Sequence, residues 1–95
     1  MTMISGPCTA LKVKKIRVEK GYLEAELYTN AGEFRIGVLA RNAKGLHVGS
    51  TQFGRTYRKR DVAERAYNGF VERAKAGGYT WSSNGYQEIR LRLVD

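Results

Sequence analysis

The chain is 95 residues long, 42% of them hydrophobic, and its 17 Lys and Arg against 9 Asp and Glu give a net charge of +8. This length and composition predict one folded domain and exclude a disordered or low-complexity chain. A single Cys and a single His exclude a disulfide within the chain and a structural zinc site, which needs several such ligands.

The first residues of the chain contain the pair Gly6-Pro7 and show no regular apolar pattern. It predicts a flexible leader, residues 1–9, ahead of a single domain formed by residues 10–95. The leader lacks the basic start and the long apolar run of a signal peptide, and no stretch of the chain is apolar enough to predict a membrane span. We therefore expect a cytoplasmic protein.

The segment after the leader predicts the most basic strand of the chain. Leu11 and Val13 fall on one face by alternation, whereas Ile16 and Val18 fall on the other, so the strand needs a bulge or a twist near Lys14-Lys15. Its positively charged side chains are Lys12, Lys14, Lys15, Arg17 and Lys20.

Two strictly alternating segments, residues 22–28 and residues 34–41, predict a pair of half-buried strands. The first segment directs Glu24 and Glu26 outward. Turn residues between the segments allow an even loop, and this pairing sets Glu26 opposite Arg35, an opposite-charge pair that favours the register.

A further strand is predicted over residues 46–53, after a second turn, with Leu46 directed inward. The turns are too short for the crossover connections of parallel strands, so an antiparallel meander is expected.

Apolar residues recur at helical spacing from near Arg58 or Lys59 to the glycine pair Gly77-Gly78, which ends the helix. Thr56 is the only nearby side chain suited to cap the helix start. Gly69, inside the helix, suggests that the helix backbone approaches the sheet closely. The apolar stripe, broad enough to lie on a sheet, consists of Val62, Ala63, Ala66, Tyr67, Phe70, Val71 and Ala74.

The tail contains the turn signal Asn84-Gly85 and an alternating strand over residues 88–93. The elements together predict an α+β fold. It is an antiparallel meander of about four strands packed against one helix in the C-terminal half, followed by a final strand, in the order ββββαβ.

A run of letters from the third predicted strand into the helix carries a resemblance. These letters are GEFR at Gly32 to Arg35, then Ala40, Asn42 and Ser50, and finally Tyr57 followed by Ala63-Glu64-Arg65. They resemble one unit of the YegP-like family of small bacterial proteins over residues 32–67. The resemblance implies a short antiparallel sheet covered by one helix, in a family without an established activity. More distantly, the strand-strand-strand-helix order resembles the DNA-binding modules of tyrosine-recombinase arm domains and plant ethylene-response factors.

The first candidate site is the basic cluster at the helix start, where an aromatic residue, Tyr57, is interleaved with cations. Cations bind phosphate and aromatic rings stack on bases. Positive charge at a helix N-terminus opposes the macrodipole, which a bound polyanion or an acidic protein surface would explain. Alternatively, the charges extend into solvent and Tyr57 packs into the core. The cations are Arg55, Arg58, Lys59 and Arg60.

Two other segments are candidate binding sites. The basic first strand would form a positive sheet edge with Arg90 and Arg92 if the first and last strands are neighbours, and otherwise presents ordinary solvated faces. Trp81 lies in an aromatic and polar segment that could stack on bases or anchor a protein interface, although closing the end of the core is the interpretation we favour. Any nucleic-acid surface must avoid or neutralise Glu24 and Glu26.

No phosphate-binding loop or catalytic constellation occurs in the sequence, so we expect a non-enzymatic protein without a cofactor or metal. The net charge favours a small nucleic-acid-binding protein that uses its basic surface mainly for phosphate contacts. The alternative is a small interaction protein, of the type made by phages and mobile elements, that modulates or inhibits a larger protein, such as a nucleic-acid-binding complex. Its partner would present an acidic surface.

Overall fold

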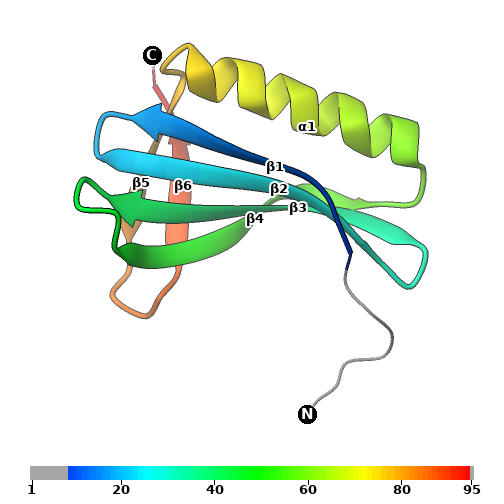
Figure 1. Cartoon of the computed structure of the whole chain (residues 1–95), viewed down its shortest axis with the longest axis horizontal. Coiled ribbons are helices and arrows are strands. Elements are labelled where there is room, and N and C mark those ends of the chain that lie inside the picture. Colours follow the sequence, from blue (N-terminus) through cyan, green and yellow to red (C-terminus); the bar gives the residue numbers. More distant parts are fainter. Residues whose placement is uncertain (1–8, 95) are drawn as a thin grey trace.

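A four-stranded antiparallel sheet with one helix on one face and a two-stranded sheet at its end makes up the computed structural model, which describes residues 9–94 (Figure 1). The α+β class and the meander predicted from the sequence are confirmed, and the structure adds one short strand before the expected final strand. The elements in chain order are β1 (Thr9–Val18), β2 (Gly21–Asn30), β3 (Glu33–Asn42), β4 (His47–Tyr57), α1 (Arg60–Lys75), β5 (Tyr79–Ser83) and β6 (Ile89–Leu93).

The predicted boundary between leader and domain falls at the start of β1. Thr9, assigned to the leader from the sequence, is the first residue of this strand. The rest of the predicted leader, residues 1–8, lies outside the described residues.

The hairpin between β2 and β3 sets the register of the sheet centre. Its loop is Ala31-Gly32, with φ of 54° and 79°, which fits the two-residue turn that needs positive φ at both central positions. This turn pairs Arg35 with Tyr28 and pairs Glu26 with Gly37. The predicted Glu26–Arg35 pair is therefore wrong, because the glycine has to lie inside the turn and this moves the pairing along the strands.

The irregularity predicted at Lys14-Lys15 lies nearer the start of β1, between Ala10 and Lys12. The tight turn into Gly21 sets the pairing with β2, which runs back unbroken to Lys12, so the mismatch in alternation is absorbed at the beginning of the strand. As a consequence, Val13 lies on the face away from α1 and is 59% exposed.

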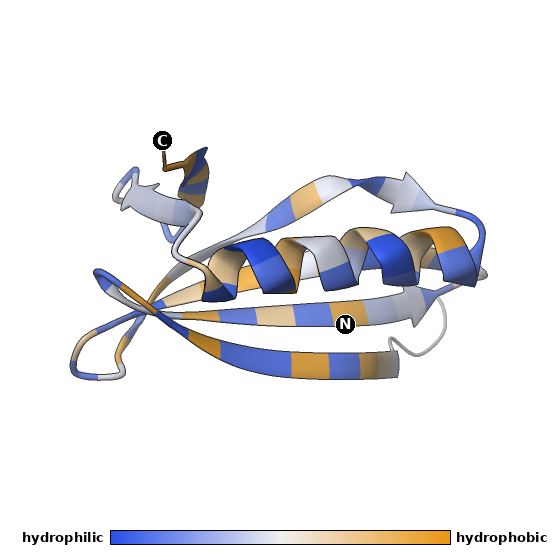
Figure 2. Ribbon diagram, turned by 90° about the horizontal axis from the view of Figure 1, so that it is seen from above, coloured by the Kyte–Doolittle hydropathy of each residue, from blue (hydrophilic) through white to orange (hydrophobic). Residues whose placement is uncertain are grey.

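The core lies between α1 and one face of the four-stranded sheet, and the hydrophobic and hydrophilic residues alternate along the strands (Figure 2). Phe70 of α1 packs between Phe53 and Tyr79, with ring centroids 4.5 and 4.8 Å away. The Tyr67 hydroxyl donates a hydrogen bond of 2.9 Å to the Ala25 carbonyl of β2. The apolar stripe predicted for the helix is thus the surface that covers the sheet.

Two expectations about side-chain placement are wrong. Leu46 is 61% exposed, because it belongs to the turn before β4, where its backbone N–H donates to the Asn42 side chain at 3.0 Å. Gly69 lies on the exposed side of α1, and a Cβ added there would meet no atom within 4 Å. The glycine is therefore not required by close packing of the helix on the sheet.

The hairpin of β5 and β6 closes one end of the core and touches the outer edge of β4 (Figure 1). The Ser50 backbone N–H donates to the Gln87 carbonyl at 3.0 Å. At the neighbouring Gly49, an added Cβ would lie 2.7 Å from the Gln87 carbonyl carbon, so only glycine permits this approach. Because β6 pairs with β5 and not with β1, the first and last strands are not neighbours, and Arg90 and Arg92 belong to a solvated face, which was the alternative to a positive edge.

Candidate functional site

The corner between β4 and α1 brings together four of the predicted site residues: Arg55, Tyr57, Arg58 and Lys59. They line an open hollow of about 320 Å³. The chain turns outward at Gly54, whose φ is 71°, and this irregularity of β4 leaves Arg55 exposed. We call Arg55, Arg58, Lys59 and Arg60 the corner cluster.

Tyr57 is half-buried, packs against the core and lies 5.3 Å from the guanidinium carbon of Arg55. Its packing against the core agrees with the core interpretation of this residue, and its ring also supports the arginine. The Arg55 guanidinium is held over the aromatic face by a cation–π contact.

The helix start adds positive potential to the corner cluster. Lys59 is the N-cap residue and makes no side-chain capping hydrogen bond. Thr56, the expected cap, instead accepts a 3.0 Å hydrogen bond from Nε of Arg35. The first backbone N–H groups of α1 are thus left without a capping side chain, and their partial charge has the same sign as the surrounding side chains.

The cations of the corner cluster differ in their partners. Arg60 forms an ion pair of 3.1 Å with Glu64, one turn along the helix. Over residues 9–94, Arg55, Arg58 and Lys59 have no carboxylate within ion-pair distance. These three exposed side chains keep their charge available to a ligand.

The cations of β1 do not form one surface. Lys12 and Lys14 lie on the side of α1, where the Lys12 Nζ is 6.0 Å from the Tyr67 ring centroid. Lys15 and Arg17 lie on the opposite face of the sheet, which we call the open face. The single basic strand expected from the sequence is therefore divided between two faces.

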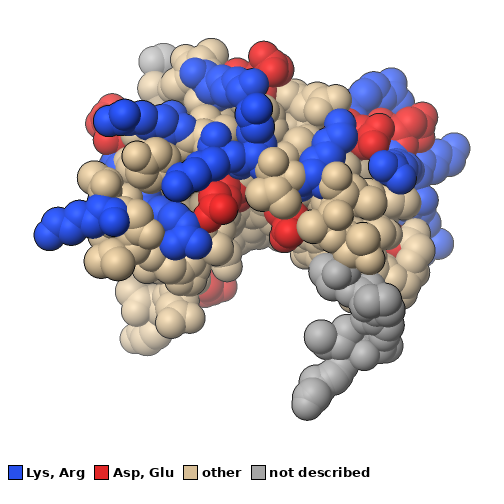
Figure 3. Space-filling view, in the orientation of Figure 1, with Lys and Arg blue, Asp and Glu red and all other residues tan. Residues whose placement is uncertain are grey.

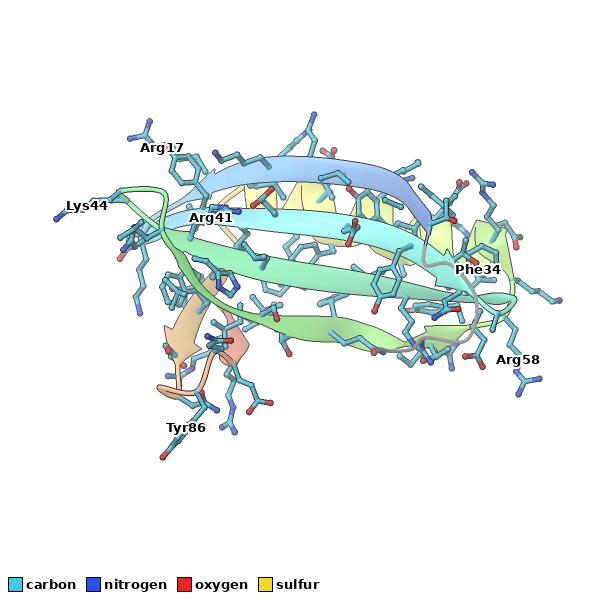
Figure 4. All side chains as sticks on the ribbon, turned by 60° about the horizontal axis from the view of Figure 1, so that its bottom comes forward. Arg17, Phe34, Arg41, Lys44, Arg58 and Tyr86 are labelled. Atoms are coloured by element: carbon cyan, nitrogen blue, oxygen red, sulfur yellow. The ribbon has the colours of Figure 1, made fainter. Side chains whose placement is uncertain are left out.

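A second basic group, of which the sequence indicated Arg17 but not Arg41, lies at the end of the open face away from the corner cluster (Figure 4). Arg17, Tyr22 and Arg41 are direct neighbours across β1, β2 and β3. The Arg41 guanidinium is held in place by Glu24 at 2.6 Å and by the Gly45 carbonyl at 3.0 Å. Only the strand register brings these residues together, so spacing along the chain could not reveal them.

Lys and Arg side chains gather toward both ends of the molecule, and acidic side chains lie between the two groups as well as among the cations at the ends (Figure 3). Glu24 and Glu26 of β2 lie in the middle of the open face, as their alternation predicts. A polyanion therefore meets attraction at either end of this face and repulsion at its centre.

Trp81 belongs to the core and is only 7% exposed. Its carbonyl accepts a 2.9 Å hydrogen bond from the Lys20 ammonium, which also lies 5.6 Å from the indole ring centroid. A covered indole cannot stack on a ligand base, so the core interpretation of this residue holds.

Burial, and to a smaller extent the negative charge of Glu26, raises the pKa of Tyr67 above its ordinary value of 10.0. The hydroxyl stays protonated and holds α1 to β2.

In the part of the chain that the structure describes, no group of three or more His, Cys, Asp or Glu is placed to hold a metal ion. Within residues 9–94, no helix has the length and apolar character needed to cross a membrane.

Comparison of the chain with protein-family models, curated proteins and solved structures found no match. The resemblance of residues 32–67 to a YegP-like unit and the more distant one to DNA-binding modules therefore stay predictions.

Proposed function

We propose that the protein binds nucleic acid through backbone phosphates and that the corner cluster makes the principal contacts. The observation that carries this proposal is the group of three exposed cations, Arg55, Arg58 and Lys59, that have no carboxylate partner within residues 9–94 and surround an uncapped helix start. Such an arrangement lowers the stability of the free helix. A bound phosphate reverses that cost, because it accepts hydrogen bonds from guanidinium groups and from the first N–H groups of the helix.

The net charge of +8 supports the same proposal. It attracts polyanions over long range and makes binding sensitive to salt. If about four phosphates are neutralised, a plot of log K against log[salt] should have a slope of about −3.6 for duplex DNA and about −2.8 for a single strand.

A charge-reversal pair tests the corner cluster. We expect Arg58→Glu/Lys59→Glu to weaken binding to a labelled oligonucleotide by more than about tenfold and to reduce the salt slope by about 1.8 on duplex DNA, because two phosphate contacts are lost. Fluorescence anisotropy at several salt concentrations measures both quantities.

The matched control is Arg90→Glu/Arg92→Glu, which changes the net charge equally at two exposed positions of β6. The control should keep the wild-type slope. Equal losses in the two variants would show that only net charge matters, and wild-type binding by the corner variant would overturn the proposal.

A protein partner is the second candidate, favoured by one exposed aromatic residue. Tyr86, at the turn between β5 and β6, is 83% exposed (Figure 4), and tyrosine is enriched in protein interfaces. The protein would then act on a larger protein that presents an acidic surface to the corner cluster. A stoichiometric partner retained after nuclease treatment, and lost with Tyr86→Ala, would favour this function over nucleic-acid binding.

A further inference from the structure

The middle of the open face contains a hollow that the corner cluster does not use. Its volume is about 700 Å³, within the range of small-ligand sites. Residues of all four strands of the larger sheet line it, so its shape depends on the sheet and not on a loop. Those that matter for a ligand are Glu26 and Tyr28 of β2, Gly37 and Leu39 of β3, and Ser50 and Gln52 of β4.

An aromatic ring forms one wall of the hollow. A Cβ built on Gly37 would lie 3.3 Å from Cε1 of Tyr28, which shows that the tyrosine ring rests directly against the glycine backbone. Because Gly37 has no side chain, the Tyr28 ring lies close to the backbone of the sheet. A flat ligand can then stack on the ring, above the apolar surface that Leu39 provides.

The polar lining of the hollow selects against phosphate. Glu24 and Arg41 both line the hollow and are paired with each other, whereas the Glu26 carboxylate makes no hydrogen bond or ion pair to another of the described residues. A free carboxylate repels phosphate and accepts hydrogen bonds from amino groups. Among the donors of an unpaired base, the exocyclic amino group offers two hydrogens where a ring N–H offers one, and it is the group that carboxylates contact on cytosine.

Cations flank the hollow along the strands. Arg41 lies toward one end, where Arg17 is its neighbour but one across the sheet. Arg35 lies toward the other end, held by Thr56 at 3.0 Å and by the Glu33 carboxylate at 3.1 Å. On β3, these two arginines are separated by six residues, which corresponds to about 20 Å. Although both arginines are ion-paired, Nη1 of Arg35 and Nη2 of Arg41 have no hydrogen-bond partner among the described residues. Phosphates on either side of a base in the hollow can therefore still meet a guanidinium while the base itself meets Glu26.

We infer that the hollow binds an unpaired nucleobase that carries an exocyclic amino group, in a single-stranded nucleic acid whose phosphates contact the flanking arginines. This inference rests on the proposed function and names its substrate class. A duplex does not fit the hollow, because its bases are stacked and paired inside, and its backbone would approach Glu24 and Glu26.

The experiment compares an oligo-dC with an oligo-dT of equal length, since thymine has no exocyclic amino group. We expect the wild-type protein to bind the oligo-dC at least about tenfold more tightly, a discrimination typical of one good base contact. Glu26→Gln should reduce this ratio to about threefold or less, because an amide also donates to the thymine carbonyl. The ratio, and not the affinity, is the readout, because removing a negative charge tightens binding to both strands.

Two variants of Tyr28 test stacking separately from the carboxylate. We expect Tyr28→Ala to weaken binding of both oligonucleotides by about tenfold, and Tyr28→Phe to bind them as the wild type does, because a phenyl ring also stacks. Thermal unfolding of each variant establishes that it is folded.

The outcomes separate this inference from the proposed function. Arg58→Glu/Lys59→Glu should weaken both oligonucleotides equally and leave their ratio unchanged. Equal binding of oligo-dC and oligo-dT, or a ratio that Glu26→Gln leaves intact, overturns the base site while phosphate binding stands. Failure of the wild-type protein to bind any nucleic acid, duplex or single-stranded, overturns both.

Discussion

Two residues, Gly69 inside α1 and Lys59 at its N-cap, make the helix less stable than other residues would at the same positions. Gly69 sits inside α1 on the solvent side, where its conformational freedom weakens the helix and no packing requires it. Lys59 occupies a capping position without capping. Lys59 belongs to the corner cluster, whereas Gly69 has no neighbour that a side chain added at position 69 would disturb.

Replacing Gly69 by alanine should stabilise the protein. The added methyl group meets no atom within 4 Å, and alanine is favoured over glycine inside a helix by about 1 kcal/mol. Urea unfolding followed by circular dichroism measures the gain. Nucleic-acid binding should not change, and a loss of binding would reveal that this side of α1 contacts the ligand.

At the scale of elements, α1 was the easiest to predict. Its apolar stripe depends only on spacing within one segment, and the observed bounds, Arg60–Lys75, lie within two residues of those expected. The four strands of the meander and their order were predicted, but the residue pairs across them were not, because the conformation of the Ala31-Gly32 turn and the bulge at the start of β1 determine these pairs. The corner cluster is contiguous in sequence and could be predicted. The hollow of the open face is formed by residues of four strands and could not be predicted.

The start of α1 allows a test in which stability and binding change in opposite directions. Lys59→Ser places a capping hydroxyl at the N-cap, which should raise the free energy of unfolding by about 1 kcal/mol. The same change removes a proposed phosphate contact, so affinity should fall and the salt slope should shrink by about 0.9 on duplex DNA. Urea unfolding and fluorescence anisotropy on one variant measure both effects. A variant that gains stability and retains the wild-type slope would exclude Lys59 from the interface.

At the scale of the whole molecule, the two sheets are joined through the edge of β4. The Ser50–Gln87 hydrogen bond and the close approach at Gly49 bring the β5–β6 hairpin against this edge. The hairpin also supplies Trp81 and Ile89 to the core. The backbone contact of Gly49 and Ser50 with Gln87 therefore connects the hairpin to the edge of the larger sheet.

Gly49→Ala should loosen this connection. Its Cβ would lie 2.7 Å from the Gln87 carbonyl carbon, a backbone atom that cannot rotate away. We expect a loss of about 2 kcal/mol in the free energy of unfolding, typical of overpacking. Trp81, the single tryptophan, lies in β5, so its fluorescence follows the hairpin while circular dichroism follows the whole chain. If the two transitions coincide at wild-type stability, the hairpin is not held through Gly49.

The register of β1 has a consequence for how copies of this protein behave in a crowded solution. Among the described residues, β1 pairs only with β2, and its other edge carries backbone groups able to recruit a further strand. The pairing that starts at the Gly21 turn places Lys12 and Lys14 on the side of α1. A strand added at this edge would have to settle beside two ammonium groups and the helix above them, and a second β1 would bring the same charges again. Charged side chains of this kind at a sheet edge oppose its growth by aggregation.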